Sequence, residues 1–173
     1  MNTRYAPPGA EVHDIVSTQT QPVRLWPPSG RIGRLRLLAY SVAVWIVSVA
    51  FNLLAGVVLA MVGSGNALAM VIAWIGTAAS LVAWWLLLIQ RSHDMGWSGW
   101  WSLLTIIPLV GLVWVFKAGD SGANRYGAPP PPNTVMVGVL GLLMPVLVAG
   151  ILAAVALPAY QAYTIKARAA QGR

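Results

Sequence analysis

No charged residue occurs between Leu37 and Gln90 of this chain. A transmembrane helix needs about 20 mostly apolar residues, so this stretch is long enough for two crossings and a turn. The rest of the composition agrees, because 58% of the 173 residues are hydrophobic and only 9% are charged. Soluble domains carry roughly 25% charged residues. The sequence therefore predicts an all-α membrane protein and excludes an ordinary soluble domain.

Apolar runs separated by turn-forming residues predict four transmembrane helices. The turn between the first two helices is expected at residues 63–66, where Gly, Ser and Asn interrupt the apolar run. A Gly- and Pro-rich loop precedes the fourth helix. The predicted helices cover residues 37–59, 67–90, 100–116 and 134–157.

The chain divides into three parts on the same evidence. Residues 1–30 are polar and rich in proline, with too few apolar residues to bury a core, and are predicted to be a disordered tail. Residues 31–130 form a membrane domain with three apolar runs. Residues 131–173 add the fourth helix and a basic tail.

The third apolar run, residues 100–116, leaves two arrangements open. Its length of roughly 25 Å as a helix is just under the thickness of the hydrocarbon core. Pro108 and Gly111 interrupt it, so the run could instead be a re-entrant hairpin, which must be buried in protein or line a water cavity. The length requirement favours a full crossing. Asp94 and Arg125 can meet only if the run does not cross.

Four crossings place both termini on one side of the membrane, together with nine of the eleven basic residues. The positive-inside rule then predicts a cytoplasmic N-terminus. The basic residues flank apolar runs, which is typical of attraction to anionic lipid headgroups and not of a nucleic-acid-binding groove. The headgroup-contacting residues predicted on this basis are Arg31, Arg34, Arg36, Lys166 and Arg168.

Four short motifs resemble one known family. They are the stretch GRIGRLR at residues 30–36, RSHD at 91–94, SGWW at 98–101 with Ile107-Pro108, and GANRYG at 122–127. In order and spacing they resemble the bacterial integral membrane family called domain of unknown function 805, over about residues 30–130. The resemblance implies a small multi-span protein of the bacterial inner membrane, with no established activity. The interaction or structural residues predicted from these motifs are Arg91, His93, Asp94, Ser98, Gly99, Trp100, Trp101, Asn124, Arg125, Tyr126 and Gly127.

Residues 150–164 resemble the N-terminal helix of type IV pilins. In pilins a glutamate lies nine residues before the matching glycine, next to a processing site. Here that position is Gly141, and Met136-Val137 stands where the cleavage site should be. The resemblance therefore implies neither processing nor glutamate-mediated filament packing.

Three small or polar residues in the predicted spans are candidates for helix packing. Asn52 can hydrogen-bond a neighbouring helix, which is worth roughly 0.6–2 kcal/mol in a membrane. Gly150 and Ala154 have the small-xxx-small spacing that lets helices approach closely. They predict a homo-oligomer or another membrane protein as partner, in addition to the lipid bilayer.

The sequence favours a protein that is not an enzyme. His93-Asp94 is the one acid–base pair near the membrane, with Ser92 and Ser98 beside it, and a polar interfacial turn explains these residues equally well. The chain has no Cys, two His and four scattered carboxylates, so neither a metal site nor a cofactor is expected. The alternatives are a small transporter or channel, and a type IV pilus-associated assembly or regulatory factor.

Overall fold

The computed structural model describes residues 20–63 and 65–171. All regular structure in these two ranges is helical, apart from one isolated bridge between Asn124 and Gly127. The elements in chain order are the α-helix α1 (Arg34–Val62), the α-helix α2 (Ala67–Asp94), the 3₁₀-helix η1 (Gly99–Ile106), the α-helix α3 (Pro108–Phe116) and the α-helix α4 (Val135–Gln171).

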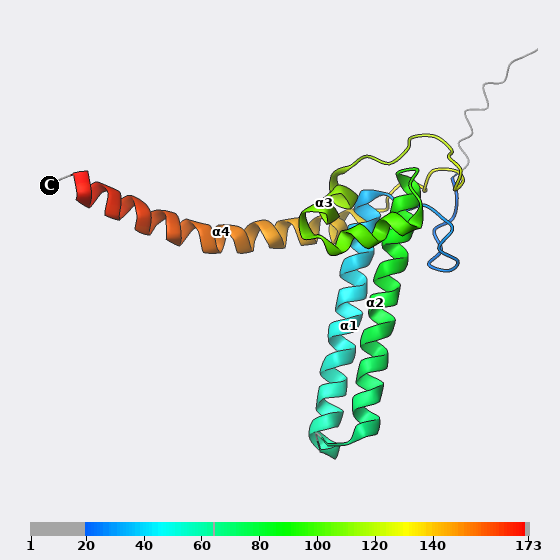
Figure 1. Cartoon of the computed structure of the whole chain (residues 1–173), viewed down its shortest axis with the longest axis horizontal. Helices are drawn as coiled ribbons and strands as arrows, with labels where there is room; N and C mark the ends of the chain where they lie inside the picture. The colour runs from blue at the N-terminus through cyan, green and yellow to red at the C-terminus, as the bar shows by residue number, and fades with distance from the viewer. Residues whose placement is uncertain (1–19, 64, 172–173) are drawn as a thin grey trace, which may run out of the picture.

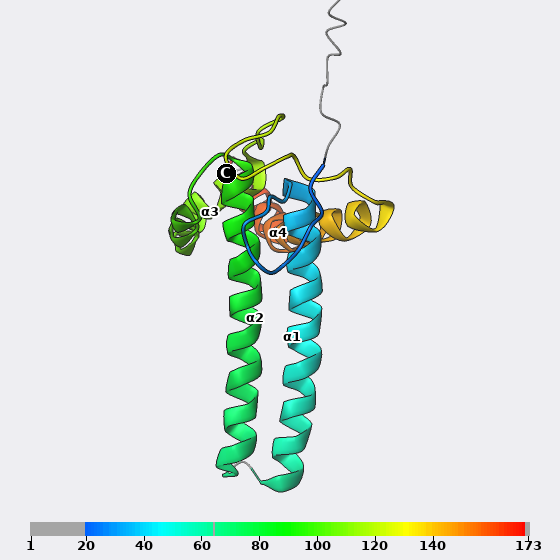
Figure 2. The same ribbon diagram turned by 90° about the vertical axis from the view of Figure 1, so that its right-hand side faces the viewer.

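Helices α1 and α2 form a long antiparallel hairpin, and the other elements gather at its open end (Figures 1 and 2). Asn66 caps α2, because its side chain accepts a hydrogen bond of 3.1 Å from the backbone N–H of Ala69. Both helices agree with the predicted spans of residues 37–59 and 67–90 and extend beyond them at the open end.

Close packing of α1 on α2 depends on Gly76. A Cβ atom placed on Gly76 would lie 1.9 Å from the ring of Phe51, so the ring sits directly on the glycine backbone. At Gly56, on α1, an added Cβ would meet no other atom within 4 Å. The two glycines therefore differ in packing although both lie within helices of the same hairpin.

We expect Gly76→Ala to lower the free energy of unfolding by about 1–3 kcal/mol, because the added methyl group must displace Phe51. Gly56→Ala is the matched control. It raises helix propensity as much as Gly76→Ala does, and the added methyl group meets no other atom. Unfolding of both variants in detergent, followed by helical circular dichroism, measures the difference. Equal stability of the two variants would contradict the packing described above.

Three helices of the described chain are long and apolar enough to cross a membrane: α1, α2 and residues Val135–Ala169 of α4. The predicted count of four crossings is not confirmed. The third apolar run is divided into η1, with eight residues, and α3, with nine, and a crossing needs about 20. Pro108 stands at the start of α3, where its missing N–H is tolerated.

Both ends of the third apolar run lie at the same end of α2. The backbone N–H of Asp120 donates to the carbonyl of Asp94 over 2.7 Å, so the chain returns to the residue from which it departed. The Arg91 side chain donates to the carbonyls of Trp114 and Lys117 in the same region. This arrangement agrees with the alternative in which the run does not cross.

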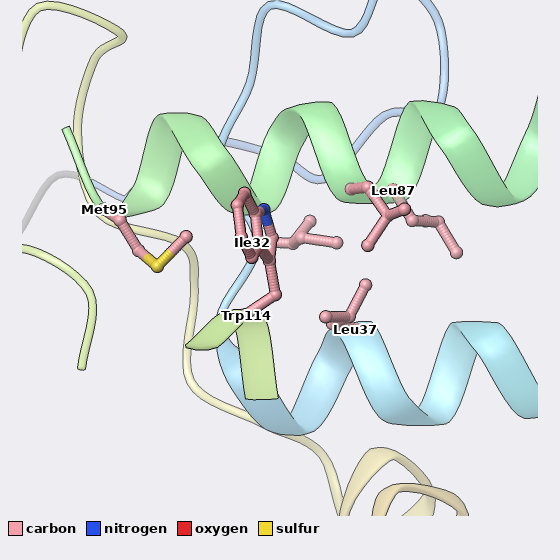
Figure 3. Packing of buried hydrophobic residues seen from close by; sticks show 6 residues of the cluster. Ile32, Leu37, Leu87, Met95 and Trp114 are labelled. Carbon is pink, nitrogen blue, oxygen red and sulfur yellow. The ribbon is translucent and has the colours of Figure 1, made fainter. Parts of the chain in front are cut away.

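A small apolar core holds this end of the hairpin together. Ile32, Leu37, Leu87 and Trp114 are almost fully buried and lie between α1 and α2, with Met95 at the edge (Figure 3). Trp114 comes from α3, so its large side chain fixes α3 against the hairpin. The core therefore positions the loops that follow α2 and α3.

Helix α4 runs across the end of the hairpin and continues away from it (Figure 1). Its first turns pack closely on α1, because a Cβ on Gly141 would lie 2.6 Å from the carbonyl oxygen of Leu35. Gly141 is the position at which pilins carry glutamate, and there is no room here for that side chain. Every residue from Pro145 to Tyr163 is exposed.

The structure describes the segment before α1 from Thr20 onward. The side-chain amide of Gln90 donates to the carbonyl of Arg24 over 2.8 Å, and the backbone of Ile32 donates to the carbonyl of Gln90. These bonds hold residues 20–30 against the end of α2, whereas the sequence predicted a disordered tail over residues 1–30. Residues 1–19 of that tail lie outside the described part of the chain.

Candidate functional site

A buried cluster of two arginines and one aspartate lies at the end of α2. Asp94 Oδ1 accepts from Arg31 Nε over 3.2 Å and lies 3.1 Å from Arg31 Nη2. Asp94 Oδ2 accepts from Arg91 Nη1, one helical turn before it. The side chains of both arginines are 0% exposed and that of Asp94 is 5% exposed. We call Arg31, Arg91 and Asp94 the arginine–aspartate cluster.

The remaining donors of the cluster bind backbone carbonyls of the loops. Arg31 donates to the carbonyls of Asp120, Gly122 and Gly127 over 2.5–3.1 Å. With the bond from Nε to Asp94, four of the five N–H groups of the guanidinium donate hydrogen bonds. Arg91 uses its Nε and Nη2 in the same manner, on the carbonyls of Trp114 at the end of α3 and of Lys117 just after it. The two guanidiniums thus hold the chain between residues 114 and 127 in place.

The position of Asp94 explains why two arginines surround it. A carboxylate at the C-terminal end of a helix is unfavourable, because that end carries partial negative charge. A carboxylate out of contact with water also costs several kcal/mol unless it is paired and hydrogen-bonded. Arg31 and Arg91 supply both the charge and the bonds. The cluster is therefore a structural element whose members depend on one another.

Residues 124–127 form a tight turn that packs on the end of α2. The Asn124 amide donates to the carbonyl of His93 over 2.9 Å, and Arg125 donates to that of Gly96 over 3.0 Å. The ring of Tyr126 stacks on His93, with centroids 3.8 Å apart and planes 11° apart. Gly127 closes the turn with φ of 110°, a conformation that favours glycine. The structure thus brings together two motifs that the sequence placed about thirty residues apart.

Other predicted residues lie away from this cluster. Ser98 precedes η1, and Gly99 packs so closely on α2 that an added Cβ would lie 2.8 Å from Ile89. Trp100 and Trp101 are exposed on η1, at 80% and 53%. Asn52 lies within the hairpin and accepts from Thr77 over 3.3 Å. Four other predicted residues lie on α4, and all of them are exposed: Gly150, Ala154, Lys166 and Arg168.

The three arginines before the first span face different surroundings. Arg31 and Arg36 are buried, at 1% and 4% exposure, whereas Arg34 is exposed. Arg36 donates to the carbonyls of Pro131 and Pro132, both over 3.1 Å. Headgroup contact was predicted for all three, and in this arrangement Arg34 alone presents its side chain outward.

Two features of this region were not predicted from the sequence: the bond between Trp114 and Ser92 beside the cluster, and the inward position of Arg31. Trp114 donates from its indole Nε1 to Ser92 Oγ over 2.8 Å, and Ser92 in turn donates to Leu88. Arg31 was interpreted as a headgroup-binding residue, because its spacing from Arg34 and Arg36 looks like a basic cluster before a span. The uncommon run RSHD at the end of an apolar helix was the one local signal of a buried polar site.

His93 and Asp94, the acid–base pair of the sequence, bond to different groups in the structure. Asp94 is bonded to arginines and not to His93, whose Nδ1 lies 3.3 Å from the carbonyl of Gly30. Among the described residues, no group of three or more His, Cys, Asp or Glu could hold a metal ion. The polar side chains of the cluster serve mainly to bind the loops to α2.

Comparison with known proteins identifies similar sequences but no similar solved structure. The inner membrane protein YhaH of Escherichia coli K12 is 41% identical over 51 residues, which are 27% of this chain and 42% of YhaH. The inner membrane protein YhaI of the same organism is 46% identical over 48 residues, 25% of this chain and 41% of YhaI. The matches thus span about two fifths of these relatives. No solved structure matches the chain.

A family model described as protein of unknown function (DUF805) matches residues 25–128. This range begins before Arg31, contains the whole arginine–aspartate cluster and the turn at residues 124–127, and ends before α4. It covers more than half of the chain, so this integral membrane protein belongs to the DUF805 family.

Proposed function

We propose that this chain is a bacterial inner-membrane protein without catalytic activity, which acts by binding other transmembrane helices and anionic lipids. The observation that carries the proposal is the uncovered surface of α4. Its side chains are exposed from Pro145 to Tyr163, including Ile151 at 64% and Val155 at 70%. A helix that is apolar on all sides needs lipid or protein around it.

Small residues on α4 support helix association in addition to lipid contact. An added Cβ on Gly150 would meet no atom of the described chain within 4 Å. Gly150 and Ala154 are one helical turn apart, and neither is covered by another element. Small residues at this spacing allow two transmembrane helices to pack with their backbones close together. The arginine–aspartate cluster, in this proposal, holds the hairpin and the loops rigid beside α4.

We expect Gly150→Leu to weaken association of α4 with a partner helix, because the larger side chain prevents close approach. A photo-crosslinking residue at Ala153 reports association in native membranes, as the yield of crosslinked product. The matched control is Ile151→Leu, which is exposed on the same helix and keeps the side-chain size. An unchanged yield with Gly150→Leu would refute the role of the small residues.

The alternative functions, transport and pilus assembly, have less support from the described residues. Transporters usually carry ionisable groups within their spans, and residues 37–90 have none. Reconstitution in liposomes tests transport directly. Proton or ion flux that depends on this chain would replace the binding proposal with a transport function.

A further inference from the structure

A cleft of about 640 Å³ lies between the start of α1, the end of α3 and the start of α4. One part of its lining is charged or polar, and another part is apolar. The charged residues are Arg34, Arg91, Asp94 and Asp120. Apolar side chains that line it include Leu35, Leu38, Val115, Phe116 and Pro145.

Arg34 is the charged group in this cleft that is free to bind a ligand. It is exposed and donates one hydrogen bond, of 3.1 Å, from Nη1 to the carbonyl of Phe116. Within the described ranges no carboxylate lies within salt-bridge distance of it. A guanidinium has five N–H donors, so most of those on Arg34 are available.

The charges around the cleft do not balance. Arg91 and Asp94 line it but are bonded to each other, and Arg31 is bonded to the same carboxylate. The carboxylate of Asp120 accepts from the Asn124 amide over 2.8 Å and lies against Gly96. Three guanidiniums thus face two carboxylates in this region, and the one positive charge left over is that of Arg34 itself.

The ends of the two hairpin helices indicate the depth of the cleft in a membrane. Arg34 is the first residue of α1 and Asp94 is the last of α2, so with both helices as spans we expect the cleft where they leave the hydrocarbon. This is the level of the phosphate groups of a bilayer. The apolar lining by Leu35, Leu38 and Phe116 continues from the charged part. A ligand with an anionic head and an apolar chain would match both parts.

From this geometry we infer that the cleft binds an anionic phospholipid, with its phosphate on Arg34 and the upper part of an acyl chain on Leu35, Leu38 and Phe116. The inference rests on the proposed lipid-binding function and names the site and the lipid class. Arginine suits this task because its planar fork binds phosphate through paired, charge-assisted hydrogen bonds. The apolar lining distinguishes a lipid from free inorganic phosphate.

Native mass spectrometry of the full chain in detergent tests the inference. Phosphatidylglycerol and phosphatidylcholine are titrated against wild type, Arg34→Gln and Arg34→Lys. We expect wild type to retain phosphatidylglycerol preferentially. Arg34→Gln should lose about tenfold in affinity for it, and Arg34→Lys should lose less because it keeps the charge. Excess inorganic phosphate should not displace the lipid.

A control variant distinguishes binding at this site from the general attraction between a basic protein and acidic lipids. Arg168→Gln removes an equally exposed cation near the other end of α4 and should leave retention unchanged. Equal loss with Arg168→Gln, or full retention with Arg34→Gln, would overturn the site. Displacement by inorganic phosphate would overturn the lipid assignment. The crosslinking experiment, with the reporter at Ala153 and the Gly150→Leu variant, does not involve Arg34, so failure of the lipid site is distinguishable from failure of helix association.

Discussion

Replacement of Asp94 with asparagine is expected to lower the free energy of unfolding by about 3–5 kcal/mol, the usual cost of leaving one side of a buried ion pair without its partner. Asp94 is the carboxylate that binds both Arg31 and Arg91, and both guanidiniums are out of contact with water. The variant leaves two buried positive charges close together. Such a change is large compared with the 0.5–3 kcal/mol of a typical substitution.

Tryptophan fluorescence during unfolding in detergent measures the effect. Among the nine tryptophans of the chain, Trp114 reports directly on this region, because its indole is buried and donates to Ser92 beside the cluster. Protease cleavage between residues 117 and 127 should increase in parallel, since Arg31 and Arg91 bind carbonyls on that stretch. Both measurements follow the same structural unit by independent means.

Asp120→Asn is the matched control for Asp94→Asn. Asp120 is exposed, and it binds Arg31 through its backbone carbonyl, which the substitution leaves in place. Its carboxylate accepts from Asn124 alone among the described residues. We expect a loss of less than about 1 kcal/mol, as for other exposed polar contacts. Equal loss from the two variants would show that the buried charges do not govern stability here.

The C-terminus is expected on the opposite side of the membrane from the loop that contains residues 117–127. With α1, α2 and α4 as the spans, the chain crosses three times. Eight of the eleven Lys and Arg residues then lie on the side of the N-terminus, and Lys166, Arg168 and Arg173 lie on the other. The positive-inside rule makes the richer side cytoplasmic. Four crossings would instead put both termini together.

This topology requires α4 to enter the bilayer. A helix at the membrane surface needs a polar face, and the exposed part of α4 is apolar on every side from Pro145 to Ala159. The segment before Pro145 packs on α1, whereas the segment after it is uncovered. Pro145 removes a hydrogen bond within the helix. We expect the segment after Pro145 to take a transmembrane direction in lipid.

Single cysteines test the topology cleanly, because the chain has none of its own. In intact cells a membrane-impermeant thiol reagent should label Ala169→Cys and leave Ala123→Cys unlabelled until the membrane is opened. Gly65→Cys, in the turn between α1 and α2, is the positive control for the outer side. Protection of Ala169→Cys together with labelling of Gly65→Cys would contradict three crossings and indicate an even number.

Local sequence patterns were reliable where the environment of a residue is uniform. The uncharged stretch from Leu37 to Gln90 predicted α1 and α2 with their turn, because lipid selects apolar residues on all sides of a helix. The same reasoning found α4, although its observed length exceeds the predicted span of residues 134–157. The family motifs of residues 30–127 were also recognisable from sequence.

The third apolar run shows where local patterns left two paths open. Its hydrophobicity is high enough for a span, and its length is nearly sufficient, so composition favoured a crossing. In the structure, polar bonds join the two ends of the run. Arg91 donates to the carbonyl of Trp114, and the backbone N–H of Asp120 donates to the carbonyl of Asp94. These bonds join residues far apart in sequence, and no short window contains both partners.

The sequence by itself determined that this is a membrane protein, where α1 and α2 begin and end to within a few residues, where α4 begins, and to which family the chain belongs. Those properties follow from the transfer of side chains between water and hydrocarbon, to which each residue contributes nearly independently. Only the tertiary structure decided that Arg31 turns inward to Asp94 and that Arg34 faces a cleft. Pairing of buried charges depends on distance in space, and the spacing of arginines along a chain does not encode it.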